Sequence, residues 1–263
     1  MKNYFISNSD LHRDSLFIDL GGFTLAASTS KCGNKSVNED CFLYYFVEPD
    51  TIILAVADGV GSTCNAHMAS YTALEALLTS LSNTSVDEGS ILRGIDAANH
   101  AILENVPGSA TTLVIAFITA DSYRYFSVGD SSSLLMGGFG KIKSKSRGHS
   151  AYDFHVESGL ELREPSVAEN LKTELISYLG SKDYICEVGV KIPMKKRDTV
   201  LLGSDGFFEN IHDFDPLCFK NRSFMNKDIK QFEYLVEQKM NSTAGHPDDS
   251  TFIILRKQGN RNE

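Results

Sequence analysis

Aspartates at the borders of apolar runs are the feature that most constrains the fold of this chain. Asp58 follows the run TIILAVA, Asp205 follows TVLLGS, and Asp248 stands shortly before TFIIL. A fourth aspartate, Asp130, follows YFSVG. Short apolar runs of this kind are typical of buried strands. Each aspartate is therefore predicted to lie at the end of a strand, where the backbone holds it rigidly and its carboxylate can face a cleft.

Carboxylates that converge on one cleft predict a bound cation. Neighbouring carboxylates repel one another unless a positive charge lies between them, and Mg²⁺ and Mn²⁺ prefer carboxylate, carbonyl and water ligands. Any one of these aspartates also fits a tight turn, because Asp-Gly is a common hairpin dipeptide. Four such junctions in one chain favour a metal cluster over four unrelated turns.

The order of apolar patterns favours an α+β fold. Helices are predicted at 66–82, 88–105, 166–179 and 227–240, and 147–165 is predicted to be irregular. Strands are predicted at 23–30, 41–47, 51–57, 110–118, 123–128, 131–136, 184–192, 199–203 and 251–255. Strands and helices come in runs instead of strict alternation, which is typical of α+β proteins. Because no repeat or long linker divides the 263 residues, we expect one domain over 1–263, with its motifs in about 23–257.

Charge and composition exclude several classes of protein. The formal net charge is -9 and no Lys/Arg run is longer than 195–197, so the basic footprint of a nucleic-acid-binding protein is missing. No stretch approaches the roughly 20 apolar residues that span a bilayer, and we expect a cytoplasmic monomer. The scattered cysteines form no CxxC pattern, which argues against a disulfide framework or a thiolate zinc site; they are Cys32, Cys41, Cys64, Cys186 and Cys218.

Six segments resemble, in order, the metal-dependent protein phosphatase family, the PP2C-type serine/threonine phosphatases, and above all its short bacterial members. They are GNKSVNED (33–40), AVADGVGS (55–62), GSATTLVIAFI (108–118), FSVGDSSSLL (126–135), LLGSDGFFENI (201–211) and DDSTFIILR (248–256). The resemblance implies an antiparallel β-sandwich flanked by helix pairs, in four α-β-β-α layers. It places the metal ions in a cleft at one end of the sandwich.

The resemblance also implies a role for each residue of the central metal pair. Asp58 is expected to bridge two Mn²⁺ or Mg²⁺ ions, and the Gly59 carbonyl to bind one of them. Asp205 and Asp248 are expected to bind the other ion. Two ions about 3.5–4 Å apart can hold a water and lower its pKa, so the expected nucleophile is hydroxide and no phosphoenzyme forms. The Cys-x5-Arg pattern of thiolate phosphatases is absent from the sequence.

Outer residues of the site follow from the same resemblance. Glu39 is expected to act through a coordinated water, and Asp40 to support that shell. Asp130, together with Asp205, is expected to hold a third and weaker ion. Lys35 stands four residues before Glu39, where the family usually has an arginine that grips the substrate phosphate. We predict that Lys35 contacts this phosphate without the planar fork of arginine; the alternative is an exposed loop lysine.

Other positions depart from the family pattern. Val60 stands where many eukaryotic members carry a histidine, so the leaving group must be protonated by metal-bound water or another group. Asp249 replaces a common asparagine and Glu209 a common aspartate, which keeps oxygen ligands but alters charge and reach. None of the seven histidines lies in a matching motif, and we interpret His149 as structural.

The predicted function is hydrolysis of phosphoserine and phosphothreonine in proteins, with phosphorylated proteins as substrates and a serine/threonine kinase as a possible counterpart. A catalytically weak regulatory module that binds phosphorylated partners is the alternative, which the lysine at position 35 leaves open. A two-metal nuclease would require a basic groove, and the negative net charge does not supply one.

Overall fold

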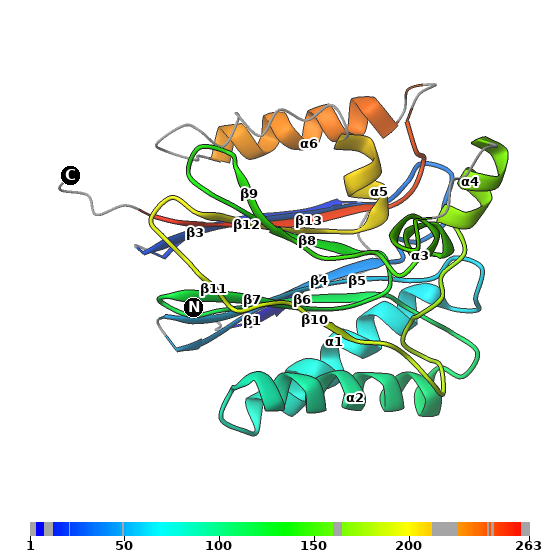
Figure 1. Ribbon diagram of the computed structural model, residues 1–263, viewed down its shortest axis with the longest axis horizontal. Coiled ribbons are helices and arrows are strands. Elements are labelled where there is room, and N and C mark those ends of the chain that lie inside the picture. Colours follow the sequence, from blue (N-terminus) through cyan, green and yellow to red (C-terminus); the bar gives the residue numbers. More distant parts are fainter. Residues whose placement is uncertain are drawn as a thin grey trace.

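Two antiparallel sheets pack face to face in the computed structural model (Figure 1). The structure describes residues 4–7, 13–20, 22–48, 50–159, 165–211, 226–240, 242 and 245–258. The first sheet has the order β1 (Tyr4–Ile6), β4 (Asp40–Glu48), β5 (Thr51–Asp58), β6 (Leu113–Ile118), β7 (Ser122–Val128) and β10 (Glu187–Val188), and β11 (Ile192–Pro193) also pairs with β7. The second sheet has the order β2 (Arg13–Asp19), β3 (Phe23–Ser30), β13 (Ser250–Lys257), β12 (Thr199–Gly203), β8 (Ser132–Met136) and β9 (Ile142–Lys145).

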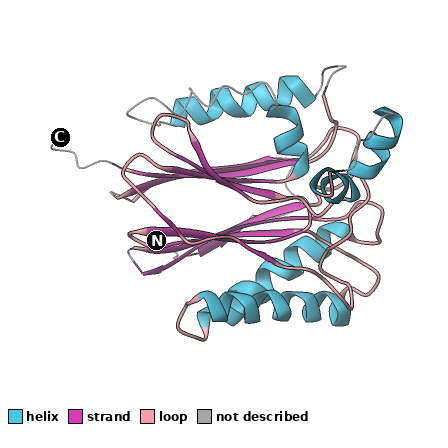
Figure 2. Ribbon diagram, viewed as in Figure 1, coloured by secondary structure: helices cyan, strands magenta, loops and turns pink. Residues whose placement is uncertain are grey.

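Helices cover the outer faces of both sheets (Figure 2). The helices α1 (Ala66–Ser82) and α2 (Glu88–Asn105) lie on the first sheet, and α6 (Asn226–Met240) lies on the second with the short α5 (Asp205–Phe208) and the 3-10 turn η1 (Glu209–Ile211). Two further helices, α3 (Ala151–Glu157) and α4 (Pro165–Lys172), lie at one end of the sandwich. None of the helices within the described ranges is long and apolar enough to cross a membrane.

The central strands are apolar throughout because both of their faces are buried. In β5, Ile53 and Ala55 belong to the cluster packed under α1 and α2, whereas Ile52 and Leu54 belong to the cluster between the two sheets. All four side chains are fully buried. Burial on both faces explains why the residues before Asp58 form an uninterrupted apolar sequence. It also holds the end of β5, and with it Asp58, in a fixed position.

Two predictions of secondary structure around residues 147–192 are wrong. The segment predicted to be irregular contains α3, whose N-terminus is closed by a capping box between Ser150 and Asp153. No residue of α3 is buried, so the helix gives no amphipathic pattern. The helix predicted at 166–179 ends at Lys172, because Leu175 and Leu179 form isolated β-bridges with Ser150 and Thr111.

The other predicted helices are confirmed, whereas several strands differ from the prediction. The strand predicted at 184–192 is reduced to the two-residue strands β10 and β11, whereas the helix predicted at 227–240 corresponds to α6. The strands β1 and β2 were not predicted. Cys218 lies outside the described residues, and the other four cysteines are free thiols.

Candidate metal centre

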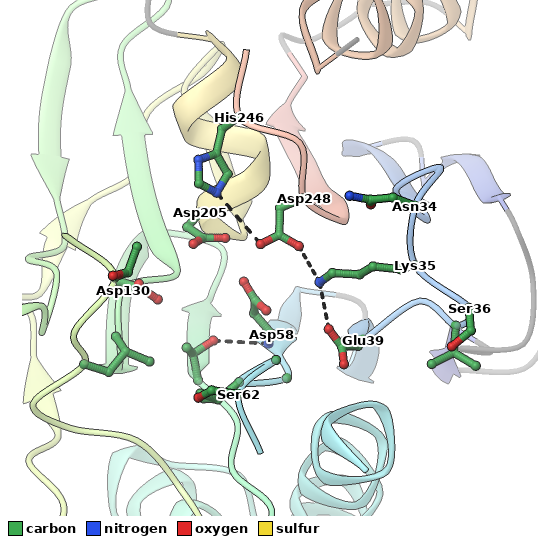
Figure 3. A pocket seen from close by; sticks show the side chains of 17 residues that line it. Asn34, Lys35, Ser36, Glu39, Asp58, Ser62, Asp130, Asp205, His246 and Asp248 are labelled. Carbon is green, nitrogen blue, oxygen red and sulfur yellow. Dashed lines mark hydrogen bonds and ion pairs between the residues drawn. The ribbon is translucent and has the colours of Figure 1, made fainter. Parts of the chain in front are cut away.

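Carboxylates from separate elements meet at one end of the sandwich (Figure 3). Asp58 is the last residue of β5, Asp130 lies between β7 and β8, Asp205 begins α5, and Asp248 precedes β13. They line one cavity of about 650 Å³, to which Glu39 also contributes. Strand ends that are far apart in sequence are thus neighbours in space, because β5 and β12 belong to facing sheets that pack against each other.

Asp40 lies behind this cavity instead of lining it. It is the register partner of Asp58 across the β4–β5 hairpin and is only 1% exposed. Its Oδ2 accepts a hydrogen bond of 2.8 Å from the Ser204 hydroxyl, whereas its Oδ1 has no hydrogen-bond partner among the described residues. A buried carboxylate oxygen without a partner is costly, and it fits a water or an ion held at this end of the sandwich.

Burial and mutual repulsion raise the pKa of several of these carboxyl groups. Burial raises the pKa of Asp58 well above its ordinary value, and the charges of Asp40 and Asp205 raise it further. The pKa of Asp130 is raised by burial and then by the charge of Asp205. A divalent cation would relieve this repulsion and satisfy the oxygens at once, so the donor set fits Mn²⁺ or Mg²⁺.

Gly59 allows the end of β5 to lie against the backbone of Ala66 and Glu39. A Cβ at this position would lie 2.5 Å from the carbonyl oxygen of Ala66 and 2.9 Å from that of Glu39. The Gly59 N–H donates to the same Glu39 carbonyl at 3.0 Å. Thr112 fixes the preceding residue, because its N–H donates to the Asp58 carbonyl at 2.8 Å. The backbone at the end of β5 is therefore held from both sides.

Lys35 lies inside the cavity, with its ammonium between Glu39 and Asp248 (Figure 3) and within ion-pair distance of Asp249 as well. Its Nζ is 2.7 Å from Glu39 Oε2 and 3.3 Å from Asp249 Oδ2, and it also contacts Asp248. Burial alone would lower the pKa of Lys35, but hydrogen bonds to Asp248 and Glu39 raise it above its ordinary value. The carboxylates therefore favour the positively charged form of Lys35 at the edge of the cluster.

Asp249 positions the loop that carries Lys35 and Glu39. Its Oδ1 accepts from the Cys32 N–H at 2.6 Å and its Oδ2 from the Glu39 N–H at 2.8 Å. The side chain is buried. Asp249 was predicted to keep an oxygen ligand and to add negative charge, but the hydrogen bonds of its carboxylate are with the backbone on either side of the 33–38 turn.

A family comparison decides the class of this protein. The model of the family described as Protein phosphatase 2C matches residues 28–243. The chain belongs to the PP2C family. It is therefore an enzyme of the metal-dependent protein phosphatase class, as the six segments predicted. A search of curated proteins finds no match to the chain.

Solved structures share the PP2C fold at low sequence identity. Stp1, a serine/threonine phosphatase from Staphylococcus aureus, has a TM-score of 0.75 at 18% identity, covering 96% of this chain and 98% of Stp1. The S. agalactiae serine/threonine phosphatase has a TM-score of 0.75 at 16% identity, covering 94% and 100%. The catalytic domain of PstP, solved in complex with two manganese ions, has a TM-score of 0.70 at 18% identity, covering 90% and 99%. The predicted layered α+β architecture is confirmed.

One residue of this PP2C site was missed by the sequence analysis. His246 lies in the cavity, with Nδ1 2.9 Å from Glu209 Oε2 and Nε2 3.9 Å from Asp248 Oδ2. The hydrogen bond to Glu209 raises the pKa of His246 to about 9. The only sequence signal was its place two residues before Asp248. His149, by contrast, uses Nδ1 to accept a 3.1 Å hydrogen bond from the Gly129 N–H.

Proposed function

We propose that this PP2C-family enzyme hydrolyses phosphoserine and phosphothreonine in proteins by attack of water, without a covalent intermediate, and that residues 1–263 act as one domain. The observation that carries this proposal is the meeting of Asp58, Asp205 and Asp248 at one cavity. Ions bound there would activate the water and screen the charge of the incoming phosphate. The cavity contains no thiol that could act as a nucleophile within the described residues.

The positions of the central residues around the cavity support the ligand roles that we propose for them. Asp58 would bridge two ions, because its strand end lies between the other carboxylates (Figure 3). The Gly59 carbonyl would bind one ion, and Asp205 and Asp248 the other. This donor set consists of oxygens, which suits Mn²⁺ or Mg²⁺. The manganese ions in PstP, a solved structure with the same fold, support the same choice.

The outer residues are assigned supporting roles. Glu39 would hold a water of the coordination shell, and Asp40 would orient that water with the Oδ1 that lacks a partner among the described residues. Asp130 and Asp205 also line an adjacent cavity of about 640 Å³ that includes Glu209. We assign Asp130 to a third and weaker ion.

Lys35 is assigned to the substrate phosphate. Its ammonium already lies at the edge of the carboxylate cluster, 2.7 Å from Glu39 Oε2. Ions bound by the carboxylates would weaken the ion pairs between these carboxylates and the Lys35 ammonium. The flexible lysine side chain would then allow the ammonium to reach the phosphate. The proposed substrates are phosphorylated proteins, and a serine/threonine kinase would supply them.

A direct test compares the wild-type protein with Asp58→Asn on a phosphothreonine peptide and on p-nitrophenyl phosphate, with Mn²⁺, Mg²⁺ or chelator. We expect activity only with an added ion. The variant should lose on the order of 100-fold or more, since even indirect partners of a metal are worth 10–100-fold. Asp50→Asn, in an exposed turn, is the matched control. Full turnover by chelated wild type would reject the proposal, and tight phosphopeptide binding without turnover would indicate the regulatory module instead.

A further inference from the structure

His246 enters the cavity from the segment before β13, beside two of the proposed metal ligands (Figure 3). One ligand atom from each of Asp205, His246 and Asp248 lies within 4.8 Å of the others. Ligands at about 2.0–2.2 Å from one ion are roughly 3–4.4 Å apart. The three side chains therefore need only a small movement to share an ion.

The backbone of His246 is fixed independently of its ring. The buried Asn210 accepts from the His246 N–H at 3.0 Å and donates to the His246 carbonyl at 2.8 Å. The same Asn210 amide donates to the Gly206 carbonyl at 2.6 Å. Because Gly206 directly follows Asp205, one side chain ties the backbone of His246 to the turn that carries Asp205.

The ring is oriented by Glu209, and its second nitrogen makes no hydrogen bond to Asp248. Glu209 Oε2 lies 2.9 Å from Nδ1, which is the arrangement in which a carboxylate fixes the tautomer and direction of a metal-binding histidine. Nε2 is 3.9 Å from Asp248 Oδ2. That distance is too long for a hydrogen bond but matches the separation of two ligands on one ion.

We propose that His246 binds, through Nε2, the ion that Asp205 and Asp248 hold, and that this nitrogen ligand makes the centre prefer Mn²⁺ to Mg²⁺. Imidazole is a good ligand for transition-metal ions, whereas Mg²⁺ binds oxygen ligands almost exclusively. The inference rests on the proposed function, because it assumes an ion at Asp205 and Asp248. It adds a nitrogen to a site otherwise built from oxygens.

Pulsed electron paramagnetic resonance of the full chain with two equivalents of Mn²⁺ tests this proposal. A coordinated imidazole gives a ¹⁴N modulation in the Mn²⁺ echo, which we expect in the wild type and in His100→Gln but not in His246→Gln. His100 is exposed on α2 and does not line the cavity. Absence of the modulation in wild type, or its persistence in His246→Gln, would overturn the assignment.

Calorimetry provides a second measurement that does not depend on activity. We expect His246→Gln to weaken Mn²⁺ binding by about tenfold or more, in the range of lost ligand interactions, and to change Mg²⁺ binding by less than about threefold. Equal losses for both ions would overturn the claimed preference. Phosphopeptide hydrolysis by the wild type separates the two proposals: activity without ¹⁴N modulation rejects only the histidine ligand, and modulation without activity rejects only the phosphatase function.

Discussion

Lys35 and Asp249 balance charge at the edge of the carboxylate cluster. Asp249 brings a buried negative charge that holds the backbone at Cys32 and Glu39, and the Lys35 ammonium lies 3.3 Å from it. A charge buried without a partner would be strongly unfavourable. We therefore expect Lys35 to stabilise the protein before ions bind and to serve the substrate phosphate after they bind.

Substitutions of Lys35 distinguish the contribution of its charge from that of its hydrocarbon stem. Lys35→Met should lower kcat/KM by roughly tenfold or more, since a charged hydrogen bond contributes about 1.5–3 kcal/mol. Lys35→Arg should keep or improve activity, because a guanidinium can bind phosphate in a bidentate manner. Steady-state kinetics with one phosphopeptide at saturating Mn²⁺, with the exposed Lys191→Met as control, measures both. A Lys35→Met variant within twofold of wild type would exclude contact with the phosphate.

At the scale of elements, the site depends on how tightly the β4–β5 hairpin packs on the start of α1. Gly59 lies in that contact, and no side chain fits between it and the carbonyl of Ala66. The hydroxyl of Ser70 in α1 donates to the Glu39 carbonyl at 2.7 Å, on the other side of the same loop. The helix thus braces the strand end and the loop together, which keeps Glu39 beside Asp58.

A methyl group at Gly59 should separate these elements. We expect Gly59→Ala to lower the free energy of unfolding by about 1–3 kcal/mol, the usual cost of overpacking, because its nearest neighbours are backbone atoms that cannot rotate away. Urea denaturation in chelator measures this without a contribution from metal binding. Gly33→Ala is the matched control, since no atom lies within 4 Å of its added Cβ. Equal stability of the two variants would contradict the packing argument.

For the molecule as a whole, the acidic cluster joins the two sheets. Asp40 and Asp58 belong to β4 and β5 of the first sheet, whereas Asp205 and Asp248 adjoin β12 and β13 of the second. Repulsion among these carboxylates would push the ends of the sheets apart, and ions bound as proposed would hold them together. The same carboxylates should therefore destabilise the chelated protein and stabilise the ion-bound protein.

This reversal can be measured through the pH dependence of stability. The folded pKa of Asp58 is raised above its ordinary value of 3.8 by burial, Asp40 and Asp205, so its charge costs stability at high pH and this cost disappears as the pH falls below the folded pKa. In chelator at pH 8, Asp58→Asn should be more stable than wild type. The difference should shrink toward zero as the pH falls toward about 4.

Urea denaturation of both proteins at several pH values checks this prediction. In excess Mn²⁺ at pH 8 the order should reverse, because only the wild type gains the full binding free energy, about 2.7 kcal/mol per site at an ion concentration 100 times Kd. A chelated Asp58→Asn protein that is less stable than wild type at pH 8 would show that the Asp58 charge is already neutralised by the chain itself.

The sequence by itself determined the central strands and the main carboxylates, because both leave local patterns. A strand buried on two faces must be apolar along its length, so the runs before Asp58 and Asp205 and after Asp248 were visible without a structure. The family resemblance then predicted how these strands and the helices form four α-β-β-α layers. It also located Lys35, although its contacts with Asp248 and Asp249 could not be read from the chain.

Only the tertiary structure decided which polar groups meet. His246 and Glu209 are 37 positions apart, and Asn210 brings them together by bonding both chain segments. The extended path after Lys172 likewise depends on bridges to Ser150 and Thr111. Such contacts leave no periodic signal in the sequence, because they join loops through single side chains. A loop residue meets its partner only after the sheets have packed, so its partner cannot be identified from the sequence.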